Sequence, residues 1–443
     1  CYESAQKIYT PAVHPREPFA TSRGMRVSPF YEREVTLGGY FMEVAGWERA
    51  HGYAANEETL FAKYRDQVPA REAEWDNRHF WQVSNAEQLA MSDGVGMINL
   101  SHFAIFDVEG SDAEALMEYL SVAKVGADTA IGKGVYTHFI DHAGGIRSDL
   151  TIIRLAEDCF RVVCGGDTGN RDYVWMRDMS ERKGFPNVTF HDRSEELSTL
   201  GLWGPEARVT LAKLMDDPES ISNESFPFAT TKEITVCGVK VWAFRISYVG
   251  EQGWELYFPF SDGLAIWDAL FELGVTPVGI ETYANSRRLE KSLRLQNADL
   301  ETDYNLYEAA LARPTVKAAD FHGKEAYVQQ RELDEQAAYL CTLVLKDTTD
   351  SNGVVRYPIG NWPILDRESK EVLIDSHGRR SYTTSMSFGP SLGLNIAMGY
   401  LPADKAKEGD IVLIEYFGEH YEAEVMKVGY GALLDPTNER PKS

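Results

Sequence analysis

The central stretch of the sequence is Gly144-Gly145-Ile146-Arg147-Ser148-Asp149-Leu150-Thr151. It begins with a two-glycine turn and continues as an apolar run, and a second apolar run over residues 159–164 follows the turn residues Ala156-Glu157-Asp158. This pattern predicts a β-hairpin whose strands span residues 149–155 and 159–164. Asp149 would stand at the mouth of the first strand, where its carboxylate either points away from the sheet or caps the turn.

Strand-turn-helix units are predicted on both sides of this hairpin. On the N-terminal side, residues 106–110 lead into the capping box Ser111-Asp112-Ala113-Glu114, in which the serine and the glutamate satisfy each other's backbone donors. On the C-terminal side, residues 200–204 lead into a helix that begins at Pro205 and extends to Met215. The similar lead-ins hint at a duplicated unit, and the alternation of strands and helices predicts an α+β fold.

A third helix is predicted from Ser261 or Asp262 to Gly274. Its apolar face would consist of Leu264, Trp267, Leu270 and Phe271. Near residue 333 the composition changes to short β-rich runs, at residues 340–345, 371–374, 411–416 and 421–428, separated by Gly, Pro, Asp and Asn. These runs predict a small C-terminal β-barrel domain over residues 333–443, after a region of two subdomains over residues 1–332.

The composition is that of a globular protein with an acidic surface. The 443 residues include 44 lysines and arginines against 68 acidic residues, which gives a formal net charge of −24. Such a charge repels polyanions, so we expect no nucleic-acid partner, and an anionic small molecule would need a local cluster of basic groups. No stretch approaches the roughly 18 uninterrupted apolar residues of a membrane span, and we expect no membrane insertion.

The five cysteines are Cys1, Cys159, Cys164, Cys237 and Cys341. They are odd in number and show no CxxC spacing, so we expect neither disulfides nor a metal site, and buried side chains for Cys159 and Cys164. His138 and His142 flank a predicted turn without a nearby carboxylate, which does not favour zinc. The start of the chain lacks the basic and apolar regions of a signal peptide, which together with the thiols predicts a cytoplasmic location.

Common hydrolase and nucleotide-binding motifs are accidental or absent. Gly389-Pro390-Ser391-Leu392-Gly393 matches the nucleophile-elbow pattern, but that pattern requires a strand before the serine and a helix after it, and neither is predicted here. Gly132-Lys133-Gly134 lacks the third glycine of a dinucleotide fingerprint, and no phosphate-binding P-loop motif occurs. The sequence therefore favours neither a serine hydrolase nor a nucleotide-dependent enzyme.

Several longer segments form a series in chain order. They are RVSPFY (26–31), GYFMEVAGWER (39–49), INLSHFAIF (98–106), GGIRSDLT (144–151), LWGPEA (202–207), SYVGEQGWEL (247–256), RLEK (288–291), ADL (298–300) and GLNIAMGYLP (393–402). This series resembles the folate-binding half of the dimethylglycine and sarcosine dehydrogenases, a branch of the glycine-cleavage T-protein (aminomethyltransferase) family. The match covers nearly the whole chain in unbroken order.

The resemblance implies a T-protein-like, multi-domain folate-binding disc followed by the small barrel, with tetrahydrofolate as the acceptor of a one-carbon unit. The flavin domain that precedes the folate half in the dehydrogenases has no counterpart in this sequence, so we expect no flavin and no metal. In this respect the chain is similar to the standalone members of the family. Those members are the glycine-cleavage aminomethyltransferase and the folate-dependent demethylases.

The same resemblance assigns the folate site to Glu255, Tyr248 and Trp254, and to the loop that contains Gly165 and Gly166. The Glu255 carboxylate would pair with the amino and ring N–H groups of the pterin, in a charge-assisted bidentate geometry. A solvated strand carboxylate is the alternative for Glu255. The two glycines would let the backbone approach a flat ring, unless they form an ordinary turn.

Binding of the folate tail is where the sequence departs from the T-protein pattern. The arginine that grips the tail carboxylate in T-proteins is replaced by Ala284, while Arg288 keeps a basic position of the family. Two roles are open for the nearby arginines Arg287, Arg288 and Arg294. They would bind the tail carboxylate in place of the missing arginine, or, because of their helical spacing, they would form a solvated face.

Three residues are candidates for catalysis. Asp149 matches the family's catalytic aspartate, and its charge would stabilise positive charge that develops during transfer. His102 and Tyr136 are candidate donor-side residues, because histidine and tyrosine can protonate a leaving group near neutral pH. For both, a satisfied polar group in the core is the alternative.

The leading functional hypothesis is transfer of a methyl or methylene group to tetrahydrofolate from a small donor: a methylated amine, an aryl methyl ether, a methylenedioxy compound or a sulfonium compound. One alternative is the glycine-cleavage aminomethyltransferase reaction, which needs a lipoyl carrier protein as partner. Another is a non-catalytic folate-binding accessory protein, which the presence of Asp149 disfavours. The donor and the oligomeric state stay open at this point.

Overall fold

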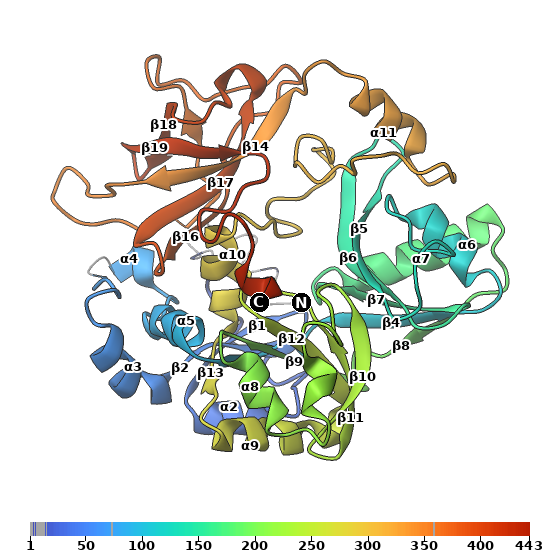
Figure 1. Cartoon of the computed structure of the whole chain (residues 1–443). Helices are drawn as coiled ribbons and strands as arrows, with labels where there is room; N and C mark the ends of the chain where they lie inside the picture. The colour runs from blue at the N-terminus through green and yellow to red at the C-terminus, as the bar shows by residue number, and fades with distance from the viewer. Residues whose placement is uncertain (1–2, 4, 6–13, 15, 72–73, 358) are drawn as a thin grey trace.

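The computed structural model describes residues 3, 5, 14, 16–71, 74–357 and 359–443, so Cys1 lies outside the described residues. Figure 1 shows three lobes that meet near the middle of the molecule, and each lobe is built on a β-sheet of five or six strands. The chain is thus a mixed helix and sheet protein, as predicted.

The first sheet has six strands in the order β10-β11-β12-β9-β3-β13. The strands span Thr231–Val236 (β10), Val239–Phe244 (β11), Gly253–Pro259 (β12), Leu197–Trp203 (β9), Gly96–Asn99 (β3) and Thr276–Pro277 (β13). Helices α8 (Ala207–Ala212) and α9 (Gly263–Glu272) pack on one face, where Leu211, Trp254 and Trp267 belong to one buried cluster. Because successive strand residues point to opposite faces, Glu255 projects from the other face of β12.

The second sheet has five strands in the order β5-β6-β7-β4-β8. They span Gly134–Ile140 (β5), Ile146–Arg154 (β6), Cys159–Cys164 (β7), Ala104–Glu109 (β4) and Thr189–Asp192 (β8). The predicted hairpin is confirmed as the antiparallel pair β6 and β7. Helices α6 (Ala113–Leu120) and α7 (Gly169–Lys183) cover the face that carries Leu150 and Ile152, so Asp149 lies on the opposite face.

The faces of these two sheets that are free of helices pack against each other. Ile153 and Val163 of the second sheet form a buried cluster with Phe244 and Tyr257 of the first. The layers therefore run helices, sheet, sheet, helices, and the residues that alternate with the helix-facing core project into the space between the sheets. Asp149 and Glu255 both belong to this inward set.

The third sheet belongs to the C-terminal lobe and has six strands in the order β15-β18-β19-β14-β17-β16, all paired antiparallel. They span Ile364–Leu365 (β15), Ile411–Tyr416 (β18), Glu419–Val428 (β19), Ala338–Leu345 (β14), Leu394–Pro402 (β17) and Thr383–Gly389 (β16). The sheet curls around its own apolar cluster, which includes Leu343, Ile414 and Val425. The predicted C-terminal barrel is thus present as a curled half-barrel, and helix α11 (Lys324–Arg331) precedes it.

The remaining elements link these sheets. They are β1 (Gly39–Val44), β2 (Trp47–Tyr53), α2 (Tyr31–Thr36), α3 (Glu57–Tyr64), α4 (Glu74–Asn77), α5 (Val83–Asp93), the π-helix η4 (Thr282–Ser286) and α10 (Arg287–Glu290). Short 3₁₀ turns occupy Ala54–Asn56, Pro218–Ile221, Phe260–Asp262, Ala403–Lys405 and Arg440–Lys442. Over the described part of the chain, no helix is long and apolar enough to cross a membrane.

Several local predictions of the helices are wrong. The capping box does not form, because Asp112 is the N-cap residue of α6 without a side-chain cap bond and Glu114 instead pairs with Arg154 at 2.7 Å. Helix α8 ends at Ala212, before the predicted Met215. In α9 the buried face carries Ile266 with Trp267 and Leu270, which leaves Leu264 39% and Phe271 45% exposed. This helix is apolar on nearly all sides, so its sequence does not identify the buried face.

Three further predictions need correction. Residues 371–374 form only isolated bridges, Leu365 with Val372 and Ile374 with Arg380, and not a strand. Cys159 is only half-buried, at the solvent end of β7, whereas Cys164 is buried as expected. The serine of the accidental elbow motif, Ser391, lies in the turn between β16 and β17: a strand does precede it, but a second strand and not a helix follows.

Candidate functional site

Asp149 lies on β6 in the space between the first two sheets. Its carboxylate accepts a hydrogen bond from the Tyr136 hydroxyl, with 3.1 Å between Oη and Oδ2, and His138 is its antiparallel partner on β5. Burial raises the pKa of Asp149 to about 6, and the hydrogen bond from Tyr136 only partly opposes this shift. The carboxylate is therefore ionised at neutral pH but weakly stabilised.

A short hydrogen-bonded chain continues behind Asp149. The Nε2 atom of His138 lies 3.2 Å from Oη of Tyr136. Burial, together with the positive charges of Arg313 and Arg294, lowers the pKa of His138 to about 3, so the imidazole is neutral at pH 7. Because the single hydroxyl proton of Tyr136 goes to Asp149, the neutral ring donates its Nε2–H to the tyrosine oxygen. The structure thus joins two predicted catalytic residues and adds His138.

Glu255 on β12 faces the same space and is 6% exposed. Tyr257, two residues further along the same strand face, donates its hydroxyl proton to Oε2 at 2.5 Å. The other oxygen accepts no hydrogen bond from the residues that the structure describes. Burial raises the pKa of Glu255 to about 7. A buried carboxylate with an unpaired oxygen is suited to accept hydrogen bonds from a ligand.

Tyr283 is an electrostatic neighbour of both carboxylates, and it was not predicted from the sequence. It belongs to the π-helix η4, and its ring centroid lies 4.8 Å from that of Tyr248. Burial raises the pKa of Tyr283 well above its ordinary value, and the charges of Glu255 and Asp149 raise it further. Both carboxylates are therefore within electrostatic reach of one tyrosine. Single π-helical turns are rare and occur frequently at functional sites.

Tyr248, a predicted cofactor residue, lines the same space. Its hydroxyl donates to the backbone oxygen of Arg294 at 2.5 Å, which fixes the ring beside Tyr283. The Arg294 guanidinium is buried, and its Nη2 atom has no hydrogen-bond partner among the described residues. The site therefore combines two carboxylates, four tyrosines and one incompletely paired cation.

The loop with Gly165 and Gly166 connects β7 to α7 at the edge of this space. A Cβ atom at Gly166 would lie 1.9 Å from the backbone oxygen of His102, so only glycine fits there. Asn297 donates to Asp167 at 3.0 Å and holds the loop from the other side. The close approach at Gly166 is made to the backbone of the chain itself, and an approach of this loop to a flat ring stays a prediction.

The side chain of His102 has Arg49 and His51 as its charged neighbours. Burial and the positive charges of Arg49 and His51 lower its pKa well below the ordinary value, so its ring is neutral. Among the described residues, no hydrogen bond joins His102 to Asp149 or Tyr136. His102 instead belongs to the N-terminal side of the molecule, where His51 binds Glu281 at 3.1 Å.

Trp254 and Arg288 do not line the site, which corrects two expectations. Trp254 is fully buried on the helix-covered face of β12, the face opposite to Glu255. Arg288 forms an ion pair with Asp299 at 2.5 Å and donates to Ser385 at 2.6 Å. Its side chain is 1% exposed, so the alternative of a solvated arginine face is also wrong: the C-terminal lobe encloses α10.

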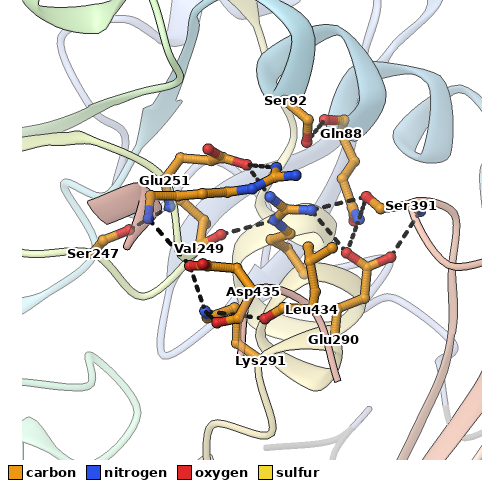
Figure 2. A network of polar contacts seen from close by, with 12 residues as sticks. Gln88, Ser92, Ser247, Val249, Glu251, Glu290, Lys291, Ser391, Leu434 and Asp435 are labelled. Atoms are coloured by element: carbon orange, nitrogen blue, oxygen red, sulfur yellow. Dashed lines mark hydrogen bonds and ion pairs between the residues drawn. The ribbon is translucent and has the colours of Figure 1, made fainter. Parts of the chain in front are cut away.

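A polar network surrounds α10 (Figure 2). The Glu290 carboxylate accepts hydrogen bonds from Gln88 and Arg287, each at 2.9 Å, and from the backbone N–H of Ser391 at 2.8 Å. These contacts join α10 to α5 and to the β16–β17 turn. Because η4 continues directly into α10, the network also fixes the position of Tyr283.

Two tyrosines of this site, Tyr257 and Tyr283, were not predicted from the sequence, and only one of them had a sequence signal. Tyr257 follows Glu255 by two positions on a strand, and the two-residue period of a strand was sufficient to place it beside Glu255. Tyr283 gave no such signal, since its placement depends on the π-helical turn. Among the described residues, no group of three or more His, Cys, Asp or Glu is placed to hold a metal ion.

Comparison with known families identifies both parts of the chain. Residues 30–318 match the GCVT N-terminal domain, and residues 360–428 match the glycine cleavage T-protein C-terminal barrel domain. Human mitochondrial dimethylglycine dehydrogenase is 30% identical over 434 residues, which cover 96% of this chain and 46% of that protein. The chain therefore spans about half the length of the dehydrogenases it resembles.

Shorter relatives match over most of their length. An aminomethyltransferase of Herpetosiphon aurantiacus is 29% identical over 386 residues, which cover 87% of this chain and 92% of that protein. The crystal structure of glycine cleavage system aminomethyltransferase T from Bartonella henselae superposes with a TM-score of 0.72 at 23% identity. That superposition covers 91% of this chain and 97% of the other, and it shows a common fold.

Proposed function

The chain belongs to the glycine-cleavage T-protein family, and we propose that it transfers a methyl or methylene group from a small donor to tetrahydrofolate. One observation carries this proposal. Asp149 and Glu255 are carboxylates with raised pKa values that face one space, share Tyr283 as a neighbour, and each accept a side-chain hydrogen bond from a single tyrosine. A site that binds one group and stabilises charge on another needs two such carboxylates.

The residues between the sheets fit tetrahydrofolate. Glu255 offers an unpaired oxygen to the N–H groups of a pterin edge, and the rings of Tyr248 and Tyr283 offer apolar surface to a flat heterocycle. When bound, tetrahydrofolate supplies the nucleophilic nitrogen that accepts the carbon unit. Glu255 is largely buried, and its low-dielectric surroundings strengthen each hydrogen bond that the carboxylate accepts.

Asp149 acts through its charge. It is ionised above a pH of about 6 and stabilises positive charge that develops at the transferred carbon. Burial and the charge of Asp149 raise the pKa of Tyr136 well above its ordinary value, so this hydroxyl keeps its proton and continues to donate to the carboxylate. His138 in turn orients Tyr136, which makes both of them positioning residues.

The donor we favour is a small methylated compound, free of any carrier protein. Ala284, at the position of the T-protein's tail-binding arginine, packs in an apolar cluster with Tyr283. A second candidate is the aminomethyltransferase reaction with a lipoyl carrier protein, which the extensive match to the Herpetosiphon enzyme favours. For either reaction we place the protein in the cytoplasm, where its free Cys164 and Cys341 stay reduced.

Mass analysis of the folate tests this function directly. The purified protein is incubated with tetrahydrofolate and, separately, with N,N-dimethylglycine, an aryl methyl ether, a methylenedioxy compound, a sulfonium compound and an aminomethylated lipoyl carrier protein. We expect a methyl or methylene gain with one donor class, and little gain with Asp149→Asn. If the folate binds but stays unmodified with every donor, the protein is an accessory folate binder and the proposal fails.

A further inference from the structure

A small cavity lies outside the site between the sheets, where the N-terminal segment meets the C-terminal lobe. Arg16, Arg71 and Phe80 line it from one side, and Tyr357, Met386 and Asn395 line it from the other. It has a volume of about 20 Å³ and is partly open to solvent, so a group that enters it can remain joined to a larger ligand outside. Figure 1 shows α4 beside the strands of the C-terminal lobe at this junction.

Arg71 lies near two aromatic rings in this cavity, and two of its nitrogen atoms are unpaired within the described chain. Its guanidinium carbon lies 3.6 Å from the ring centroid of Phe80 and 4.0 Å from that of Tyr357. Its Nε and Nη2 atoms are buried and have no hydrogen-bond partner among the residues that the structure describes. Burial lowers the pKa of Arg71 to about 9, so the side chain is still charged at neutral pH. A buried cation without a partner is costly unless a ligand supplies one.

The unpaired atoms form a defined edge of the guanidinium. Nε and Nη2 donate in the same direction, and other arginines of this chain bind a carboxylate through this edge. Arg33 binds both oxygens of Asp268 at 2.8 Å, and Arg161 binds both oxygens of Asp107 at 2.8 and 2.9 Å. Arg71 lines the cavity, and its same edge has no carboxylate partner among the residues that the structure describes.

The acidic side chains near Arg71 are bound elsewhere. Asp76 accepts a hydrogen bond from Tyr416 at 2.8 Å and pairs with Arg356 at 3.5 Å. Glu281 binds Arg16 at 3.1 Å and is shared with a histidine. The described chain therefore supplies the cation, the aromatic faces and the enclosure, but no anion.

We propose that this cavity binds the carboxylate of an organic ligand, through the Nε and Nη2 atoms of Arg71. Arg16 adds a second positive charge at the wall, and the apolar side chains exclude water that would weaken the pair. The site itself follows from these contacts, whereas the identity of the ligand that carries the carboxylate rests on the proposed function. It is either the one-carbon donor, as an N-methylated amino acid or a sulfonium carboxylate, or the glutamate tail of the folate.

Two pairs of probes distinguish these sources by calorimetric titration of the wild type and of Arg71→Met. The first pair is N,N-dimethylglycine and its uncharged amide, and the second is tetrahydrofolate and tetrahydropteroate, which lacks the glutamate. We expect Arg71→Met to weaken binding of the carboxylate-bearing member of one pair by about tenfold or more and to leave its partner unchanged. The pair of probes in which the affinity changes identifies the ligand that carries the carboxylate. Equal affinities of both proteins for all four probes would overturn the proposal.

Controls separate binding from folding and from catalysis. Arg65→Met removes an exposed arginine close by in sequence and should change none of the four affinities. Arg71→Met should melt no earlier than the wild type, because it removes an unpaired buried charge. If it fails to fold, Arg71→Lys keeps the charge, removes the two-atom edge and is expected to weaken the same probe. No titration requires carbon transfer, so failure of the proposed reaction would leave this result intact.

Discussion

Two regions of the molecule bury ionisable side chains, and they pair them very differently. Around α10, Arg288 binds Asp299 and Ser385, and Glu290 accepts from two side chains and one backbone N–H (Figure 2). Between the first two sheets, neither Asp149 nor Glu255 forms an ion pair with any described residue. Each accepts one hydrogen bond from a tyrosine side chain.

This difference separates structural charges from charges that serve a ligand. A buried charge with an opposite partner and several hydrogen bonds is satisfied. Removal of one partner leaves the other as an uncompensated buried charge, which destabilises the fold. A buried carboxylate with a raised pKa and an unpaired oxygen is destabilising unless a ligand completes it. Substitutions in the α10 network should therefore affect folding, and substitutions between the sheets should affect binding and transfer.

The largest effect is expected in the α10 network. Arg288→Met leaves Asp299 buried without its cation, and we expect the free energy of unfolding to fall by about 3–5 kcal/mol. Urea denaturation measures this, with the exposed Arg182→Met as the matched control. The same variant also tests whether Arg288 contacts folate. Normal stability with weakened folate affinity would reverse the role that its buried ion pair indicates.

Between the sheets, Asp149→Asn keeps the shape of the side chain and removes its charge. If the charge acts on the developing positive carbon, single-turnover transfer should fall about a hundredfold or more, while folate affinity changes less than tenfold. The melting temperature should not fall, because the buried charge is weakly stabilised. A turn-capping aspartate would give the opposite pattern, with lower stability and nearly normal transfer per folded molecule.

Glu255 is expected to matter for affinity. Glu255→Ala removes the proposed partner of the pterin edge and should weaken tetrahydrofolate binding by about 2 kcal/mol or more, the usual cost of deleting a charged hydrogen-bond partner. Calorimetric titration measures the change, and Glu233→Ala on the exposed edge strand β10 is the control. Unchanged affinity in a folded Glu255→Ala variant would separate the folate site from this carboxylate.

Much of the fold followed from local sequence patterns. The β6–β7 hairpin could be predicted because two apolar runs flank a short polar turn, and the C-terminal strands because they are short and separated by turn residues. The buried face of α9 could not, since Leu264 and Phe271 are as apolar as the residues that pack inward. The ion pair of Arg288 depends on Asp299, which the following irregular segment folds back onto α10.

Family-like motifs and strand alternation predicted part of the candidate site. Asp149 and Glu255 came from family-like motifs, and alternation along β12 already excluded Trp254 from the face of Glu255. Tyr283 was out of reach because a π-helical turn in the chain is a tertiary outcome. Arg71 could not be predicted for another reason: its lack of a hydrogen-bond partner among the described residues is visible only once the N-terminal segment packs against the C-terminal lobe.

The smallest effect expected is a pH dependence of stability that differs in sign between paired and unpaired carboxylates. The pKa of Glu255 is raised from 4.5 to about 7 in the native protein, so between these pH values the native state holds a proton that the unfolded state releases. The free energy of unfolding therefore falls as the pH rises through this window, and it is flat above it.

Glu255→Gln should remove this slope, and the wild type should lose about 2 kcal/mol more than the variant between pH 5 and 7. Glu281 provides the opposite case. Although burial opposes ionisation there, Arg16 and His51 lower its pKa well below the ordinary value, so its contribution is present above about pH 4.5 and is lost as the pH falls further. Urea denaturation of the wild type, Glu255→Gln and Glu281→Gln across pH 3–8 measures both signs. Parallel curves for the wild type and Glu255→Gln would mean that Glu255 is already satisfied in the free protein, and the contrast between the two regions would then rest on Asp149 alone.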